Sequence, residues 1–359
     1  MESSPDASPL DTPERVARAA VIAYTATYFS GMPFQDPVIT LLKEYLPGAK
    51  SVACNELLVM QHLQQGFPDV TEKWQAASAI ISQNPPIVQV LGYFLAGQSE
   101  RAQLADVVST DDDAVDASSM QDVTADTIWL VQKWDGMAPL SLYPRAQQTS
   151  GFGLGRVFGG GNAARRDRYA MLKAICKGAL SALNFVHCRQ VVHGSLGSGS
   201  ILLSTFNDQE WSRLVVKIDN FGFARWVTSP DVTSRKGAAW GPKEALFPTP
   251  KPADDSPLLV GQRLDLQQTA IVLLEVILSA LAENGQNDGT SAGSIQRVLC
   301  DVYGWDVDQY IRFVSEEPDW INAAEFLGGG DNAGWEMIRS LVEGNITCEE
   351  ILSSRFYQL

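Results

Sequence analysis

The chain has 359 residues, of which 45% are hydrophobic and 19% charged, and its formal net charge at pH 7 is −15. This composition lies outside the disordered range and is typical of a globular protein long enough to bury one large core or two moderate ones. The acidic balance argues against a nucleic-acid partner, because the chain has no basic excess to neutralise phosphates, and it favours a basic protein partner.

Neither the start of the chain nor its cysteines indicate secretion. Residues 1–14 are polar and are expected to form a flexible tail without the apolar core of a secretory signal. No apolar run approaches the roughly 18 residues that span a bilayer, so no transmembrane segment is expected. The five cysteines are widely spaced and form no CxxC pair, which predicts buried free thiols in a reducing compartment. We therefore expect a soluble intracellular protein of the cytoplasm or of an organelle interior, such as a plastid.

The first third of the chain reads mainly as strands. Alternating or β-rich runs predict strands over Val21–Phe29, Pro37–Tyr45, Ile87–Leu95 and Thr127–Gln132. Between the second and third of these, the spacing of apolar residues predicts a helix over Val52–Gln65.

Aspartates accumulate between residues 98 and 126, with no Lys or Arg between Arg101 and Lys133. A run of this kind is expected to be a solvated insertion, and the alternative interpretation is a docking segment for a basic partner.

The rest of the chain reads mainly as helices. A glycine-rich segment over about 146–165 is expected to be a second insertion, followed by an amphipathic helix over Arg168–His187. Short β-like runs follow at Ser200–Leu203 and Leu214–Ile218, and the most apolar helical stretch is Leu264–Leu281. The order indicates an α+β fold with a small β-rich part before a larger helical part.

Two segments resemble motifs of the protein kinase superfamily. His193–Leu203 resembles the catalytic loop with its following strand, and Val216–Arg225 resembles the strand and magnesium-binding turn. Their order and spacing fit, with the long helix ending just before them at His187. The resemblance implies a two-lobed protein-kinase-like fold: a small antiparallel β-sheet lobe with one helix over 15–132, and a larger, mainly α-helical lobe over 133–359.

Further positions follow from these anchors. Lys43 resembles the phosphate-binding lysine, and Glu56 lies where its glutamate partner is found on the small-lobe helix. With Lys43 and Glu56, the resemblance implies nucleotide-binding candidates at the back of the pocket and in the hinge: Gln132, Lys133 and Trp134. It also implies structural roles in the core of the fold for Met60, His193, Phe221, Gly222, Glu244 and Asp265.

The residues that the chemistry requires are replaced. Ser195 stands where the family has its catalytic aspartate, and serine at neutral pH is a poor base. Gly197 replaces the loop lysine, Ser200 the asparagine that holds a second magnesium, and Asn220 the magnesium-binding aspartate. Asp219 is the other candidate metal ligand, but neighbouring side chains on an extended segment point to opposite faces, so we expect that it does not simply substitute for Asn220.

The glycine-rich phosphate loop is also missing, because no glycine precedes Gly31. The segment Gly151–Val157 matches such a pattern only after the hinge region, where a flexible linker is expected. ATP and magnesium therefore remain candidate ligands with weakened sites.

We expect a pseudokinase that acts as a scaffold or regulatory protein-binding module. The alternatives are an atypical active Ser/Thr kinase that uses ATP, with Asp219 as metal ligand, and a nucleotide-binding regulator without turnover.

Overall fold

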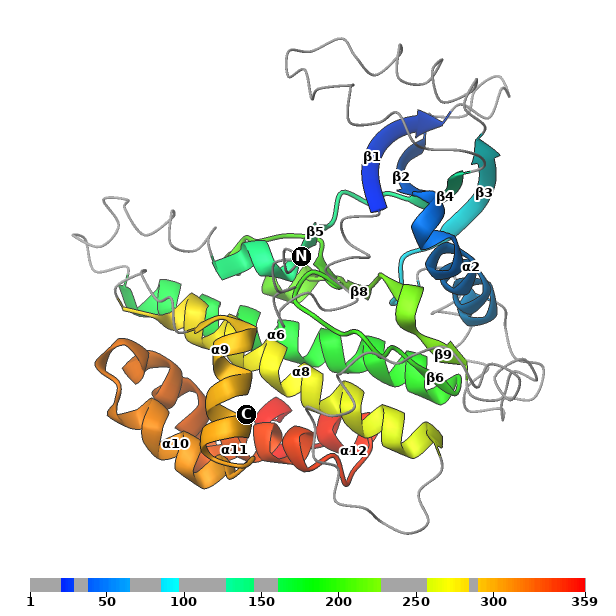
Figure 1. Cartoon of the computed structure of the whole chain (residues 1–359). Helices are drawn as coiled ribbons and strands as arrows, with labels where there is room; N and C mark the ends of the chain where they lie inside the picture. The colour runs from blue at the N-terminus through cyan, green and yellow to red at the C-terminus, as the bar shows by residue number, and fades with distance from the viewer. Residues whose placement is uncertain are drawn as a thin grey trace, which may run out of the picture.

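The computed structural model describes residues 21–28, 38–64, 85–96, 127–144, 161–226, 257–283 and 290–358. These residues form a mixed α+β fold, in which a small antiparallel sheet and one helix lie beside a larger group of helices (Figure 1).

The small sheet has four strands in the order β1–β2–β4–β3, and all neighbouring pairs are antiparallel. β2 and β4 are therefore central, and Lys43 on β2 stands between Ala23 of β1 and Leu130 of β4. Their β-branched and aromatic residues suit a pleated, half-buried surface. The bounds are β1 Val21–Tyr28, β2 Val38–Tyr45, β3 Val90–Ala96 and β4 Thr127–Lys133.

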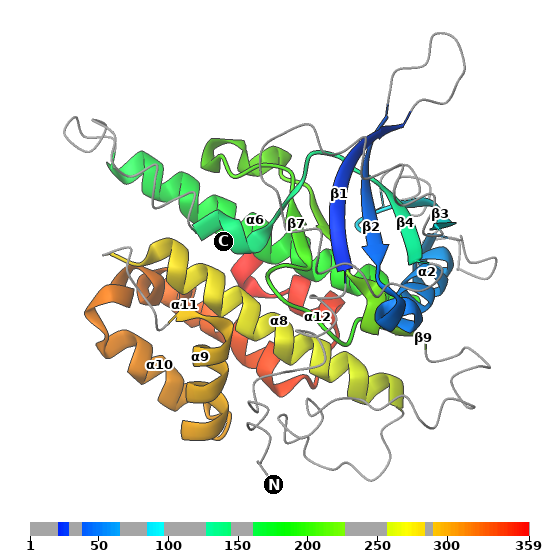
Figure 2. The same ribbon diagram turned by 45° about the horizontal axis from the view of Figure 1, so that its top comes forward.

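Helix α2, Lys50–Gln64, packs against this sheet (Figure 2). Between them lies a small apolar cluster to which Tyr45, Ala53 and Leu130 belong. Across the sheet, the ring of Trp129 stacks at 5.4 Å on Tyr24 and at 5.6 Å on Phe94. The cluster fixes the position of α2 relative to β2, which brings together the two elements that carry Glu56 and Lys43.

Shorter strands form two further small sheets. The three-stranded sheet has the order β5–β7–β8, and a further pair joins β6 to β9. Ile87 forms a parallel bridge with Ile218 on β8, so the chain before β3 is tied directly to the second sheet. The bounds are β5 Ala138–Pro139, β6 Val191–Val192, β7 Ile201–Leu203, β8 Val216–Ile218 and β9 Arg225–Trp226.

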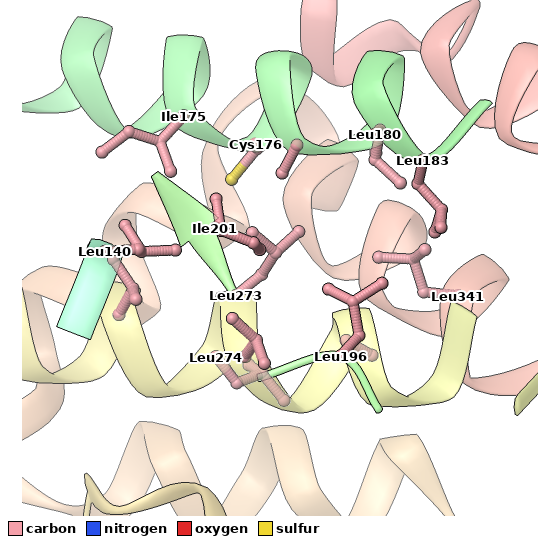
Figure 3. Close-up of a cluster of buried hydrophobic side chains, with 14 of the residues drawn as sticks. Leu140, Ile175, Cys176, Leu180, Leu183, Leu196, Ile201, Leu273, Leu274 and Leu341 are labelled. Carbon is pink, nitrogen blue, oxygen red and sulfur yellow. The ribbon is translucent and has the colours of Figure 1, made fainter. Parts of the chain in front are cut away.

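The larger core lies around α6 and α8, where aliphatic side chains from both helices and from β7 interdigitate (Figure 3). Side-chain caps mark where some helices begin, as at Asp306 before α10 and at the Thr347–Glu350 capping box of α12. The bounds are α6 Gly161–Cys188, α8 Pro257–Leu281, α9 Ala292–Gln296, α10 Val307–Glu316, α11 Ile321–Glu343, with non-helical residues at 329–332, and α12 Cys348–Leu352.

Single turns and a π-helical turn complete the described secondary structure. They are η1 Pro47–Ala49, η3 Leu140–Leu142, η5 Asp208–Arg213, η6 Phe221–Phe223, the π-helical η9 Arg297–Val302, η10 Pro318–Trp320 and η11 Arg355–Tyr357.

Helix α8 bears on the expectation that the chain has no transmembrane segment. By length and composition it is apolar enough to cross a membrane, and it is the one described helix of which this is true. Most of its apolar stretch is buried inside the protein, however, as in the core helix of a soluble fold.

Several other predictions need correction. Helix α6 begins at Gly161, inside the range predicted as a glycine-rich insertion, and α8 begins seven residues before Leu264. All five cysteines are free, but only Cys176 and Cys348 are buried. The acidic segment over 98–126 and Glu244 lie outside the described residues, so the predictions made for them are not tested.

Candidate functional site

Lys43 and Glu56 form a buried ion pair between β2 and α2. The ammonium Nζ of Lys43 lies 2.9 Å from Oε1 of Glu56, and both side chains are almost wholly excluded from solvent. Lys43 faces α2 because it lies on the same side of β2 as Tyr45, two residues further along the strand.

Asp219 and Asn220 bring two more acceptors to the same ammonium. Nζ of Lys43 lies 2.8 Å from Oδ2 of Asp219 and 2.9 Å from Oδ1 of Asn220. The expectation that these neighbours point apart is wrong with respect to Lys43. The alternation of an extended strand ends at Asn220, which adopts the left-handed conformation with φ 66° and ψ 52°. Their exposure still differs, since Asp219 is buried and Asn220 is exposed.

Two further side chains complete what we call the Lys43 cluster: Lys43, Glu56, Asp219, Asn220, Gln132 and Tyr45. The buried amide of Gln132 donates to Glu56 Oε1 at 3.3 Å and to Asp219 Oδ1 at 3.1 Å. The Tyr45 hydroxyl donates to Glu56 Oε2. Burial, and then the charge of Glu56, raise the pKa of Tyr45 far above its ordinary value, so Tyr45 stays a neutral donor.

The electrostatics keep Lys43 charged. Burial by itself lowers the pKa of Lys43, but the charges of Asp219 and Glu56 outweigh it and raise this pKa above its ordinary value. One ammonium and two carboxylates give the Lys43 cluster a formal charge of −1. An ammonium has three N–H donors, and here it has three acceptors.

A second polar group fixes the loop that follows β6. The buried carboxylate of Asp265 accepts from the backbone N–H groups of His193 at 2.7 Å and Gly194 at 2.8 Å. Its Oδ2 also lies 2.9 Å from Nε2 of His187. The His193 ring lies 2.9 Å from the carbonyl oxygen of Asp219, so the loop is tied to the Lys43 cluster.

This loop carries the three serine and glycine positions singled out from the sequence. Ser195 and Gly197 are partly exposed, whereas Ser200 is buried. The loop closes in a turn, with Ser200 N–H donating to the Gly197 carbonyl at 2.9 Å. None of these three residues carries a carboxylate or a charge, so this part of the loop presents neither a strong base nor a charged metal ligand.

Two of the residues expected to have structural roles in the core, Met60 and Phe221, belong to the same apolar cluster. Both side chains are fully buried, and the ring of Phe221 lies 4.9 Å from that of His193. At Gly222 a Cβ atom would come within 2.4 Å of Val52 Cγ1, so only glycine allows α2 to approach this closely. Asn55 on α2 donates to the Gly222 carbonyl at 3.0 Å.

Lys133 and Trp134 do not join the Lys43 cluster. Their backbone N–H groups donate within the protein, from Lys133 to Gln89 O at 2.8 Å and from Trp134 to Ile39 O at 3.1 Å. The Lys133 ammonium lies 3.0 Å from Asp135 Oδ1. These two N–H groups are therefore already engaged and do not face a ligand.

Some residues of the site were not singled out from the sequence. They are Tyr45, the Lys217–Asp135 ion pair with its Nζ–Oδ2 distance of 2.6 Å, and Gln268, whose Oε1 accepts from Leu196 N–H at 2.8 Å. For Tyr45 the sequence offered one signal, its spacing of two residues from Lys43 along a strand. It offered no such signal for the Lys217–Asp135 pair or for Gln268. Among the described residues, no group of three or more His, Cys, Asp or Glu side chains could hold a metal ion.

Comparison with known proteins does not add to this description. No protein-family model matches the chain, and a search of curated proteins returns no match.

Proposed function

We propose that this chain is a pseudokinase: a protein-kinase-like protein that does not transfer phosphate and acts as a scaffold or regulatory binding module. In this proposal its ligand is another protein, for which the net charge of −15 favours a basic surface.

The arrangement of the described elements supports the kinase-like part of the proposal. A buried lysine on a central strand pairs with a glutamate on the adjacent helix. The buried carboxylate of Asp265 holds the backbone of the loop that follows β6. These two groups lie in the order that the sequence motifs predict, and this agreement supports a kinase-like fold.

The residues at the catalytic and metal-binding positions support the proposed lack of activity. Phosphoryl transfer needs an accepting base and carboxylates that hold magnesium. Ser195, Ser200 and Asn220 occupy these positions, and the nearby carboxylate of Asp219 has both oxygens engaged, by Lys43 and Gln132. A general base alone contributes about 10²–10⁴-fold to a rate, so several replacements together are incompatible with efficient transfer.

A transfer assay tests the proposal. The purified chain is incubated with ATP labelled on the γ-phosphate, with Mg²⁺ or Mn²⁺, and label is followed into the chain itself, a generic basic protein substrate and free phosphate. An active protein kinase serves as the positive control. We expect no label above the background without protein. Transfer by the wild-type chain that is lost in Lys43→Ala and Asp219→Ala would overturn the proposal.

A further inference from the structure

The Lys43 cluster contains its own anion. Asp219 Oδ2 lies 2.8 Å from Lys43 Nζ, and the side chains of both residues are 6% exposed. The contact is thus a short, nearly dry ion pair, which is much less screened than one at the surface.

The solvent side of Lys43 is defined by Asn220. Glu56 and Asp219 are buried, whereas Asn220 is exposed and its Oδ1 lies 2.9 Å from the ammonium. A solute that reaches Lys43 from outside must therefore displace a neutral amide oxygen, which is the weakest of the three acceptors.

Charge then decides what can bind there. With both carboxylates in place the cluster has a formal charge of −1, which repels an approaching phosphate or pyrophosphate. Without the carboxylate of Asp219 the formal charge is zero, and one N–H of Lys43 loses its acceptor. The Gln132 amide contacts both carboxylates, but Glu56 also accepts from the Tyr45 hydroxyl, which holds it in place on α2.

We propose that Asp219 is a built-in competing anion that closes a latent phosphate-type anion site on Lys43. The ligand class of that site is a di- or triphosphate, free or as part of a nucleotide, bound without a metal ion. The inference rests on the proposed function in one respect: the wild-type chain is taken to leave this site empty of nucleotide.

Gain of binding tests the inference. Inorganic pyrophosphate and ATP, each in the presence of a chelator, are titrated by calorimetry into the wild-type chain and into Asp219→Ala. We expect Asp219→Ala to bind pyrophosphate at least about tenfold more tightly than the wild type. The gain should disappear in the double variant Lys43→Met/Asp219→Ala. A gain with ATP but none with pyrophosphate would overturn the inference, because it would point to recognition of the base.

Asp135→Asn is the matched control. Asp135 pairs with a different buried lysine, Lys217, at 2.6 Å, so the variant removes an equal charge elsewhere. We expect no Lys43-dependent binding from it. Unchanged affinity in a folded Asp219→Ala variant, or a gain that persists in the double variant, would overturn the inference.

Two arrangements keep the test decisive. If Asp219→Ala does not fold, Asp219→Asn preserves the size of the side chain and its contact with the Gln132 amide while removing the charge.

A second experiment uses the wild-type chain. Acylation of Lys43 by a small anhydride should be slow and unaffected by pyrophosphate, and protection by pyrophosphate would contradict the inference. Failure of the proposed function would appear separately, as magnesium-dependent transfer by the wild-type chain.

Discussion

Asp265 and His193 are joined by a hydrogen bond in which the backbone N–H of His193 donates to Oδ2 of Asp265 over 2.7 Å. The carboxylate is fully buried on α8, and the histidine begins the loop that carries Ser195. Because the His193 ring also meets the Asp219 carbonyl, this one bond connects the helical core with the loop and, through it, with the Lys43 cluster.

Replacing Asp265 should therefore unfold the loop and weaken the whole fold. Asp265→Ala removes a buried acceptor from two backbone donors, and hydrogen bonds to charged groups contribute about 1.5–3 kcal/mol each, so we expect a loss of about 3 kcal/mol or more in the free energy of unfolding. Urea unfolding measures this loss. Asp308→Asn, which breaks a surface ion pair with Arg339, should change little. Equal, small effects of both substitutions would contradict the role of Asp265.

Gly222 should not tolerate a side chain. In Gly222→Ala the new Cβ would meet Val52 Cγ1 at 2.4 Å, so α2 must move away from η6, at a cost of about 1–3 kcal/mol. Gly199→Ala is the matched control, since nothing lies within 4 Å of a Cβ there. Thermal unfolding should show a lower midpoint for the first variant only, and Gly222→Ala/Val52→Ala should recover part of the loss. No recovery would show that the contact with Val52 is not the cause.

Stability should fall as the pH drops below about 6.5, the ordinary pKa of histidine. Burial lowers the pKa of His193, against the opposing charges of Asp265, Asp219 and Glu56, so the folded protein keeps it neutral. The neutral ring can donate from Nε2 to the Asp219 carbonyl and accept at Nδ1 from Ser195 N–H at 3.3 Å. The pKa of His62 is lowered by burial too.

The direction of this pH dependence follows from proton uptake on unfolding. The unfolded chain binds a proton near pH 6.5 that the folded chain does not, so this contribution is complete above that pH and is lost on acidification. Each such histidine changes the free energy of unfolding by at most about 1.4 kcal/mol per pH unit. Urea titrations between about pH 7.5 and 5.5 measure the slope, which should be shallower in His193→Gln. A flat profile in the wild type would contradict the neutral, buried His193.

Lys43 should matter more for stability than either of its carboxylate partners. Lys43→Met leaves Glu56 and Asp219 as two buried carboxylates without a cation, and breaking a buried pair in this way costs about 3–5 kcal/mol. Glu56→Gln and Asp219→Asn each leave one carboxylate to balance Lys43, so each should cost less. Chemical unfolding of the three variants gives the ranking. A Lys43→Met variant as stable as the wild type would show that the Lys43 cluster does not hold β2 and α2 together.

Local patterns predicted the elements better than their contacts. The strands β1, β2 and β4 lie where alternation and β-branched residues placed them, because the period of a strand is visible in the sequence. The start of α6 was missed, since Gly161 and its polar neighbours lack the apolar spacing that marks the rest of that helix. The exposed Cys54 and Cys188 show that residue type alone predicts burial poorly.

The site was predicted in part. The Lys43–Glu56 ion pair was expected from the resemblance, and the structure contains it. The contact of both Asp219 and Asn220 with Lys43 was not expected, because it depends on the left-handed conformation of Asn220, which no periodic pattern reveals. The engagement of the Trp134 N–H by Ile39 likewise depends on how the chain leaves β4.

A titration of the wild-type chain with ATP tests whether the protein lacks a working nucleotide site. Thermal unfolding is followed while ATP is added to about 5 mM, with and without magnesium. A site with a Kd of about 50 µM would stabilise the fold by about 2.7 kcal/mol, enough to raise the melting temperature by several degrees. We expect no shift under either condition, because the Lys43 ammonium and the N–H groups of Lys133 and Trp134 are already engaged. A shift that requires magnesium would contradict this expectation and would indicate a working nucleotide site.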